Sequence, residues 1–192
     1  MMRTIEWLSR RAMGVAGWCY LAMTLLICFD ILARRLLGFS SEATTELNGY
    51  LLAIGMSWGL AGTLFERGHV RIDVLLQRLP QRWRTALHLL SLLALAVSVG
   101  FFIWGSVSLT LDSLSFGATD LSALRTPLVI PQGLWAAGFV LFGLAVLAWL
   151  SRGLALAWQG QAARLDAELT SRSDQEEAAE TLQALGKAPP KP

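Results

Sequence analysis

The chain has 192 residues, of which 54% are hydrophobic and only 16% are charged. Soluble domains usually carry about 25% charged residues, so this composition indicates a membrane protein. The formal net charge of +2, without a basic stripe interleaved with aromatic residues, excludes a typical nucleic-acid-binding protein.

Four segments are apolar and long enough to cross a bilayer core, which takes about 20 helical residues. They are Ala12–Ala33, Leu47–Phe65, Ala86–Leu111 and Leu128–Leu150. The first follows two arginines, as a secretory signal would, but its apolar run is too long for one and three further spans follow it. We therefore expect an all-α polytopic membrane protein with four transmembrane helices.

The first predicted span ends in charged residues. Asp30 and Arg34 are four positions apart, with Arg35 next to them. This spacing places Asp30 and Arg34 on one helix face, where they can form an ion pair at the membrane boundary. Gly38 follows as a candidate helix end.

Two glutamates open the second predicted span. Ser40 or Ser41 is a candidate N-cap, Glu42 then falls in the first helical turn, and Glu46 shares its face one turn later. Two interpretations of these carboxylates stay open. They either cap the helix and form interfacial salt bridges, or they bind a partner or an ion directly.

The middle of the second span is rich in small residues. Gly55 and Gly59 form a G-x-x-x-G motif, Gly62 extends the same face, and Trp58 lies beside it. Glycines at this spacing let another helix approach closely. We expect a packing surface here, although one sequence leaves open whether the neighbour is internal or another protein.

A charged segment, FERGHVRIDVLL, separates the second and third spans. It holds Arg67, His69, Arg71 and Asp73. Apolar residues at helical spacing through Ile72–Leu79 predict a short amphipathic helix at the membrane surface, ended by Pro80. The arginines fit a solvated cytoplasmic loop, whereas Asp73 suggests a contact that orients the helix or docks it on a partner.

The chain changes character after the last span. We expect that helix to continue through Leu154–Leu165 and then to give way to an acidic segment that closes in prolines. The sequence therefore predicts a four-helix transmembrane domain over residues 1–165 and a cytoplasmic tail over 166–192, frayed or disordered.

Arginines are unevenly distributed across the predicted spans. On one side are Arg3, Arg10, Arg11, Arg67, Arg71, Arg78, Arg82, Arg84, Arg152 and Arg164. The other side has Arg34, Arg35 and Arg125. The positive-inside rule then predicts that both termini are cytoplasmic.

No arrangement of residues indicates catalysis. There is no nucleophile with an adjacent base, no metal-binding spacing and no phosphate loop. The two histidines, His69 and His88, do not lie deep on facing spans as a bis-histidine haem would require. We expect no enzyme, no cofactor and no metal site. The spans also lack the buried charges of a proton or ion pathway, so we do not expect the chain to transport alone.

These features together resemble a known family. An apolar span ending in Asp30 and Arg34, glutamates at 42 and 46, Trp58–Gly59 and the segment RGHVRIDVLLQRLP are similar to the small membrane subunit, the Q-type component, of tripartite ATP-independent periplasmic (TRAP) transporters. The likeness covers roughly residues 10–150 and leaves out the acidic tail.

The resemblance implies a heteromeric importer in a bacterial inner membrane. In that family a large multi-span subunit moves the solute, driven by a cation gradient, and a soluble periplasmic binding protein captures it, typically a carboxylate or a sulfonate. The small subunit is implied to be a scaffold with no catalytic residues. Two other classes stay open: an accessory or anchor subunit of another membrane complex, such as a membrane enzyme, and a standalone small carrier.

Overall fold

The structure is a computed structural model that describes residues 2–39, 42–66, 80–122, 124–162 and 164–165. Its long elements are all helices: α1 (Met2–Leu36), α2 (Glu42–Phe65), α4 (Gln81–Phe116) and α5 (Val129–Trp158). The predicted all-α class is confirmed. The amphipathic helix expected over Ile72–Leu79 and the tail over 166–192 lie outside the described residues.

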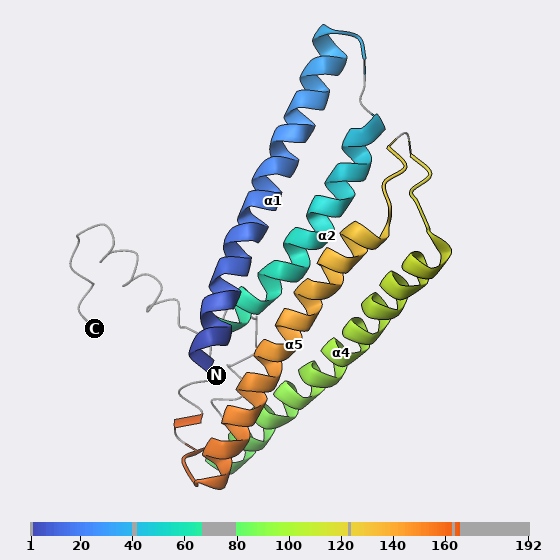
Figure 1. Cartoon of the computed structure of the whole chain (residues 1–192). Helices are drawn as coiled ribbons and strands as arrows, with labels where there is room; N and C mark the ends of the chain where they lie inside the picture. The colour runs from blue at the N-terminus through green and yellow to red at the C-terminus, as the bar shows by residue number, and fades with distance from the viewer. Residues whose placement is uncertain (1, 40–41, 67–79, 123, 163, 166–192) are drawn as a thin grey trace, which may run out of the picture.

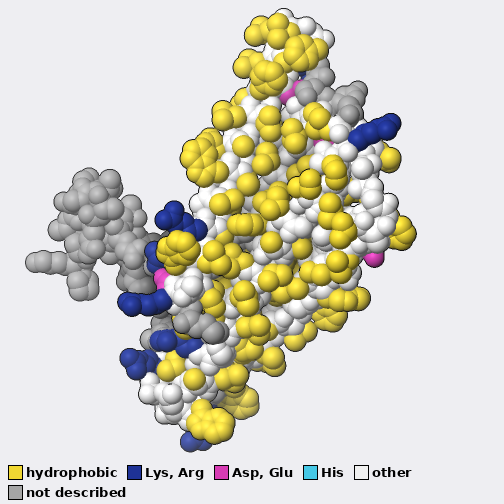
Figure 2. Space-filling model, in the orientation of Figure 1, with side chains coloured by type: hydrophobic (Ala, Val, Ile, Leu, Met, Phe, Trp, Pro, Cys, Tyr) yellow, Lys and Arg dark blue, Asp and Glu magenta, His cyan; other side chains and the backbone are white. Residues whose placement is uncertain are grey.

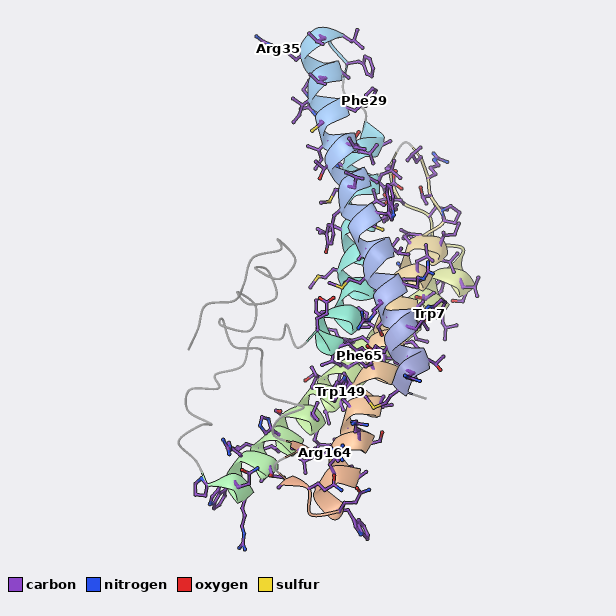
Figure 3. The ribbon with its side chains drawn as sticks, turned by 90° about the vertical axis from the view of Figure 1, so that its left-hand side faces the viewer. Trp7, Phe29, Arg35, Phe65, Trp149 and Arg164 are labelled. Carbon is purple, nitrogen blue, oxygen red and sulfur yellow. The ribbon has the colours of Figure 1, made fainter. Side chains whose placement is uncertain are left out.

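The helices form a row in the order α1, α2, α5, α4 (Figure 1). α1 packs along α2, α2 packs along α5 and α5 packs along α4, with a smaller contact between α1 and α5. α1 and α4 are therefore the edges of the row. The α1–α2 pair extends beyond α4 and α5 at one end, and α4 and α5 extend beyond it at the other (Figures 1 and 3).

Three of the helices are long and apolar enough to cross a membrane by length and composition: α1, α4 and α5. α2 has 24 residues but includes many glycine, serine and threonine residues, which lower its hydropathy. The fourth span expected at Leu47–Phe65 is thus a helix over the predicted residues, and its passage through the membrane stays a prediction.

Two of these helices are much longer than a bilayer core is thick. α1 has 35 residues and α4 has 36, which at 1.5 Å per residue is about 53 Å. The hydrocarbon core is about 30 Å thick. Such helices tilt or extend into the interfacial layers, which is consistent with the offset between the two pairs.

Glycines in the left-handed conformation follow three of the helices. Gly38 has φ 72°, Gly117 has φ 60° and Gly160 has φ 69°. The predicted helix end at Gly38 is confirmed, because α1 ends at Leu36.

The predicted continuation of the last helix through Leu165 is wrong. α5 ends at Trp158, and Gly160 reverses the chain. The reversal brings Leu165 into a fully buried position against Leu92 and Leu156. Burial of this leucine beside α4 and α5 offsets the loss of further helical turns.

The main core lies along α5, between α2 on one side and α4 on the other. Its buried members include Ala61 and Leu64 from α2, Val99 from α4, and Phe142 and Ala145 from α5. Near the C-terminal end of α2, the rings of Phe65 and Trp149 pack between α2 and α5, with their centroids 6.0 Å apart.

Small residues on α5 allow the close approach of its neighbours. A methyl group added to Gly138 would lie 2.7 Å from Cδ1 of Trp58 and 2.8 Å from Cβ of Ser57, both on α2. A methyl group on Gly143 would meet Cδ1 of Ile103 on α4. Only glycine fits at Gly138 without displacing the α2 backbone, because the clash there involves Ser57 Cβ.

We therefore predict that Gly138→Ala destabilises the bundle by about 1–3 kcal/mol, as overpacking does in well-packed cores. Gly59→Ala is the matched control, because its added methyl group would lie at an ordinary 3.7 Å from Cβ of Ala16. Alanine also favours a helix over glycine by about 1 kcal/mol, so this control should be neutral or stabilising. Unfolding of both variants in detergent measures the difference. Equal stability of the two variants would contradict the close α2–α5 contact.

Candidate functional site

The charged end of α1 is an ion pair, as the sequence predicts. Nη2 of Arg34 lies 2.7 Å from Oδ2 of Asp30, and the Asp30 side chain is only 11% exposed. A nearly buried carboxylate at a membrane boundary is costly without such a partner. Arg35 is exposed at the same tip (Figure 3). This ion pair stabilises the last turns of α1.

A polar cluster joins the start of α2 to the loop between α4 and α5. The Tyr50 hydroxyl lies 2.8 Å from Oε1 of Glu46 and 2.7 Å from Oδ2 of Asp120. The Ser122 hydroxyl donates to Oε2 of Glu46, and the Ser122 backbone N–H donates to Oδ1 of Asp120 at 3.1 Å. We call Glu46, Tyr50, Asp120 and Ser122 the loop cluster. Because a phenol has one hydroxyl proton, Tyr50 donates to one carboxylate at a time.

The loop that supplies Asp120 and Ser122 has its own backbone order. The N–H of Asp120 donates to the carbonyl of Thr126, and the N–H of Leu128 donates to the carbonyl of Ala118, both at 3.0 Å. Thr119 and Pro127 form an antiparallel bridge. The loop is therefore a small hairpin-like unit, fastened to α2 by side chains.

Hydrogen bonds lower the pKa of both carboxyls in the loop cluster. For Glu46 the largest cause is the bond from Ser122, with further bonds from Thr126 and Tyr50. For Asp120 the largest cause is the bond from Tyr50, followed by the Ser122 backbone. These donors favour the ionised carboxylates, so the cluster is anionic at neutral pH.

The glycine face of α2 is occupied from within the chain. A methyl group on Gly55 would lie 3.3 Å from Cβ of Cys19, and one on Gly62 would lie 2.8 Å from Sδ of Met13, both on α1. The neighbour that the sequence left open is thus α1 along this face.

Trp58 connects α2 to α5. Its indole Nε1 donates to the carbonyl oxygen of Leu134 at 2.8 Å. This hydrogen bond satisfies the polar atom of a large side chain at a helix interface. Trp58 therefore belongs to the α2–α5 seam and not to the α1–α2 contact made by the glycines beside it.

Of the remaining residues that the sequence indicated as functional, the structure describes one and leaves the others outside its described ranges. Glu42 is the first residue of α2, as predicted. The charged segment between the second and third predicted spans, with Arg67, His69, Arg71 and Asp73, lies outside the described residues.

The sequence analysis missed most of the loop cluster. The sequence indicated Glu46 without a partner in the fold and gave no role to Tyr50, Asp120 or Ser122. The one local signal is the four-residue spacing of Glu46 and Tyr50, which places both on one face of α2. The contacts with Asp120 and Ser122 join residues 70 and 76 positions apart, which no local pattern reveals.

The described surface is dominated by apolar side chains. Figure 2 shows them over most of the visible face, with many of the basic side chains gathered near the N-terminal end of α1. The edge helices carry large exposed residues along their length, among them Trp18, Leu25 and Phe29 on α1 and Leu93, Phe101 and Trp104 on α4. Within the described residues no group of three or more acidic, histidine or cysteine side chains could hold a metal ion.

These features define the class of protein. The chain is an all-helical membrane protein with long apolar helices, and its polar contacts join one helix or loop to another.

The family follows from comparison. Residues 23–161 match the family of tripartite ATP-independent periplasmic transporters, DctQ component. The match covers most of the chain, so the protein belongs to this family and is a TRAP transporter small (Q) subunit. This is a family of transporter components and not of enzymes, and it implies a complex with a large membrane subunit and a solute-binding protein. Comparisons with curated proteins and with solved structures gave no match.

The loop cluster predicts a pH dependence of loop docking. Because docking lowers both carboxyl pKa values, the undocked state takes up protons at a higher pH than the docked state. The stabilisation is therefore complete above the ordinary carboxyl range of about 4 and is lost as the pH falls through the lowered values. The protection of residues 118–128 against hydrogen exchange, taken as the ratio of the intrinsic to the observed exchange rate at each pH, should therefore fall over that acidic range. Constant protection there would contradict this prediction.

A substitution at Tyr50 tests the contribution of its hydroxyl apart from that of its ring. Tyr50→Phe removes the hydroxyl that bonds both carboxylates, and exchange of residues 118–128 should become roughly fivefold faster at neutral pH, the equivalent of one ordinary hydrogen bond. Tyr20→Phe is the control, since Tyr20 lies on α1, in the groove against α2. The same acceleration in both variants would show that the loop is not held by Tyr50.

Proposed function

We propose that this subunit is a scaffold for the large transport subunit of a binding-protein-dependent importer. The observation that carries the proposal is the combination of uncharged helix interiors with extended apolar surfaces on both edge helices. Between Thr85 and Leu111, and again between Val129 and Ser151, the sequence has no Asp, Glu, Lys or Arg. Midplane transport sites are usually built from charged residues and broken helices, whereas α4 and α5 run unbroken through these stretches.

The edges of the row are the surfaces offered to lipid and to the large subunit. α1 and α4 each pack on one main neighbour and expose the rest of their circumference, including Leu25 and Phe101. Such surfaces in a membrane bind through shape and packing because lipid tails are as apolar as the helices. We also propose that four residues of the charged segment act in assembly: Arg67, His69, Arg71 and Asp73.

The family resemblance is the basis for the proposed mode of transport. We propose secondary-active import of a carboxylate or sulfonate solute, captured by the periplasmic binding protein and driven by a cation gradient. The scaffold corresponds to residues 1–165, with 166–192 as a cytoplasmic tail. An accessory role in another membrane complex is the alternative, and it predicts co-purification with different partners.

The proposed location is a bacterial inner membrane with α2 as the fourth span. In the structure the N-terminal end of α1 shares one end of the bundle with the C-terminal end of α5, and the α4–α5 loop lies at the other end (Figure 1). The arginine distribution supports placing the first of these ends in the cytoplasm.

Two matched substitutions test this topology. Thr4 and Thr45 are both exposed, near the starts of α1 and α2. In a variant lacking Cys19 and Cys28, a cysteine at Thr45 should react with an impermeant thiol reagent in spheroplasts, and a cysteine at Thr4 only after lysis. Reaction of both cysteines before lysis would contradict the topology.

Reconstitution tests the scaffold role itself. Liposomes that contain only this chain should show no gradient-driven uptake, and uptake should require the large subunit and the binding protein together with this chain. A photoreactive amino acid at Leu25 or Phe101 should capture the large subunit at one edge at least. Transport by this chain alone, or full transport by the large subunit without it, would overturn the proposal.

A further inference from the structure

Among the described residues, a groove lies between α1 and α2. It has a volume of about 380 Å³, which is within the range of small-molecule sites. Its wall on α1 comes from Met13, Ala16, Gly17 and Tyr20, and its wall on α2 comes from Gly55, Met56, Gly59, Leu60 and Thr63. Both walls of the groove belong to this chain, so ligand binding there can be measured without the large subunit.

The groove is suited to a hydrocarbon chain. The groove is open at Gly17, where an added methyl group would have no atom within 4 Å. The hydroxyl of Thr63 already donates to the carbonyl of Leu60 at 2.9 Å, so this polar atom needs no ligand. Apart from Tyr20 and Thr63, the groove is lined by glycine, methionine and aliphatic side chains, and it therefore fits an acyl chain better than a polar solute.

A basic residue stands at the N-terminal end of the groove. Arg10 precedes Met13 by three positions and Gly17 by seven, so all three share one face of α1. Its side chain points toward the N-terminus, as helical side chains do, and it is 73% exposed. Trp7, a typical interfacial residue, is exposed at the same end of α1 (Figure 3).

The charges around Arg10 leave it able to bind a phosphate. Its Nη2 lies 2.9 Å from Oε1 of Glu6, which uses one of the five N–H donors of the guanidinium. Arg3 and Arg11 lie on the same end of α1, and Arg11 stacks on Trp7 at 5.4 Å from the ring centroid. Glu6 and the exposed Glu66 at the end of α2 are the carboxylates nearest in sequence to the groove.

We propose that this groove binds one phospholipid from the leaflet at the N-terminal end of α1, with an acyl chain in the groove and the phosphate on Arg10. The bound chain lies against α1 at Gly17, where the groove is open. The acyl chain thereby packs against both α1 and α2 and stabilises their contact.

The test uses two pairs of matched variants and native mass spectrometry. Gly17→Leu fills the groove, whereas Gly14→Leu adds the same side chain to α1 at a position where a methyl group also has no neighbour and which does not line the groove. Arg10→Gln removes the phosphate contact, whereas Arg11→Gln removes an arginine that stacks on Trp7. Each purified chain is transferred from nanodiscs of dioleoyl phosphatidylglycerol into detergent, and the phospholipids retained per chain are counted. A parallel series contains dioleoylglycerol, which has the same acyl chains without phosphate.

The proposal predicts that the wild-type chain and Gly14→Leu retain one phospholipid that Gly17→Leu loses. Arg10→Gln should weaken phospholipid retention roughly tenfold, as expected for a lost charged hydrogen bond, with unchanged retention of dioleoylglycerol. Arg11→Gln should resemble wild type in both series. Circular dichroism confirms that the variants are equally helical.

Two results with the isolated chain would overturn the proposal: equal lipid retention by Gly17→Leu and Gly14→Leu, or equal phospholipid retention by Arg10→Gln and Arg11→Gln. A third would come from co-purification of the same variants with the large subunit. Loss of the large subunit from Gly17→Leu, with lipid retention unchanged, would show that a partner helix and not a lipid occupies the groove.

Discussion

The close packing of α2 against α5 is the contact on which the rest of the bundle depends. In a membrane, apolar burial gives helices little reason to associate, so van der Waals contact and hydrogen bonds must hold them together. Gly138 lets Ser57 and Trp58 approach the α5 backbone, and the Trp58 indole bonds the carbonyl of Leu134. Among the described residues, the other contacts between the α1–α2 pair and the α4–α5 pair are the smaller α1–α5 contact and the loop cluster.

Different contacts hold the two ends of the α2–α5 interface, and this difference bears on function. At one end the rings of Phe65 and Trp149 pack together. At the other end the loop cluster fastens the α4–α5 loop to α2 through ionised carboxylates. The interior helices are thus fixed along their length, while α1 and α4 remain free on their outer sides. A rigid row with two apolar edges suits a subunit that supports a larger membrane partner.

The sequence predicted the features that depend on neighbouring residues. Hydropathy located the helices, four-residue spacing paired Asp30 with Arg34, and Gly38 marked the end of α1. It could not predict which helices are neighbours, because the loop cluster and Gly138 act across long sequence separations. It extended α5 through Leu165 since the local pattern is helical, whereas packing of Leu165 on α4 and α5 favours a reversal at Gly160.

The central claim, that α2 lies beside the α4–α5 pair, can be tested directly by cross-linking at the loop end of α2 in native membranes. In a chain without Cys19 and Cys28, cysteines at Glu46 and Ser122 replace two side chains that are in contact. A short bifunctional thiol reagent should join them within one chain in high yield, whereas cysteines at Glu46 and Asp112, a residue of α4 outside the loop cluster, should not be joined. Absence of the first cross-link, or its formation only between two copies of the chain, would contradict the arrangement described.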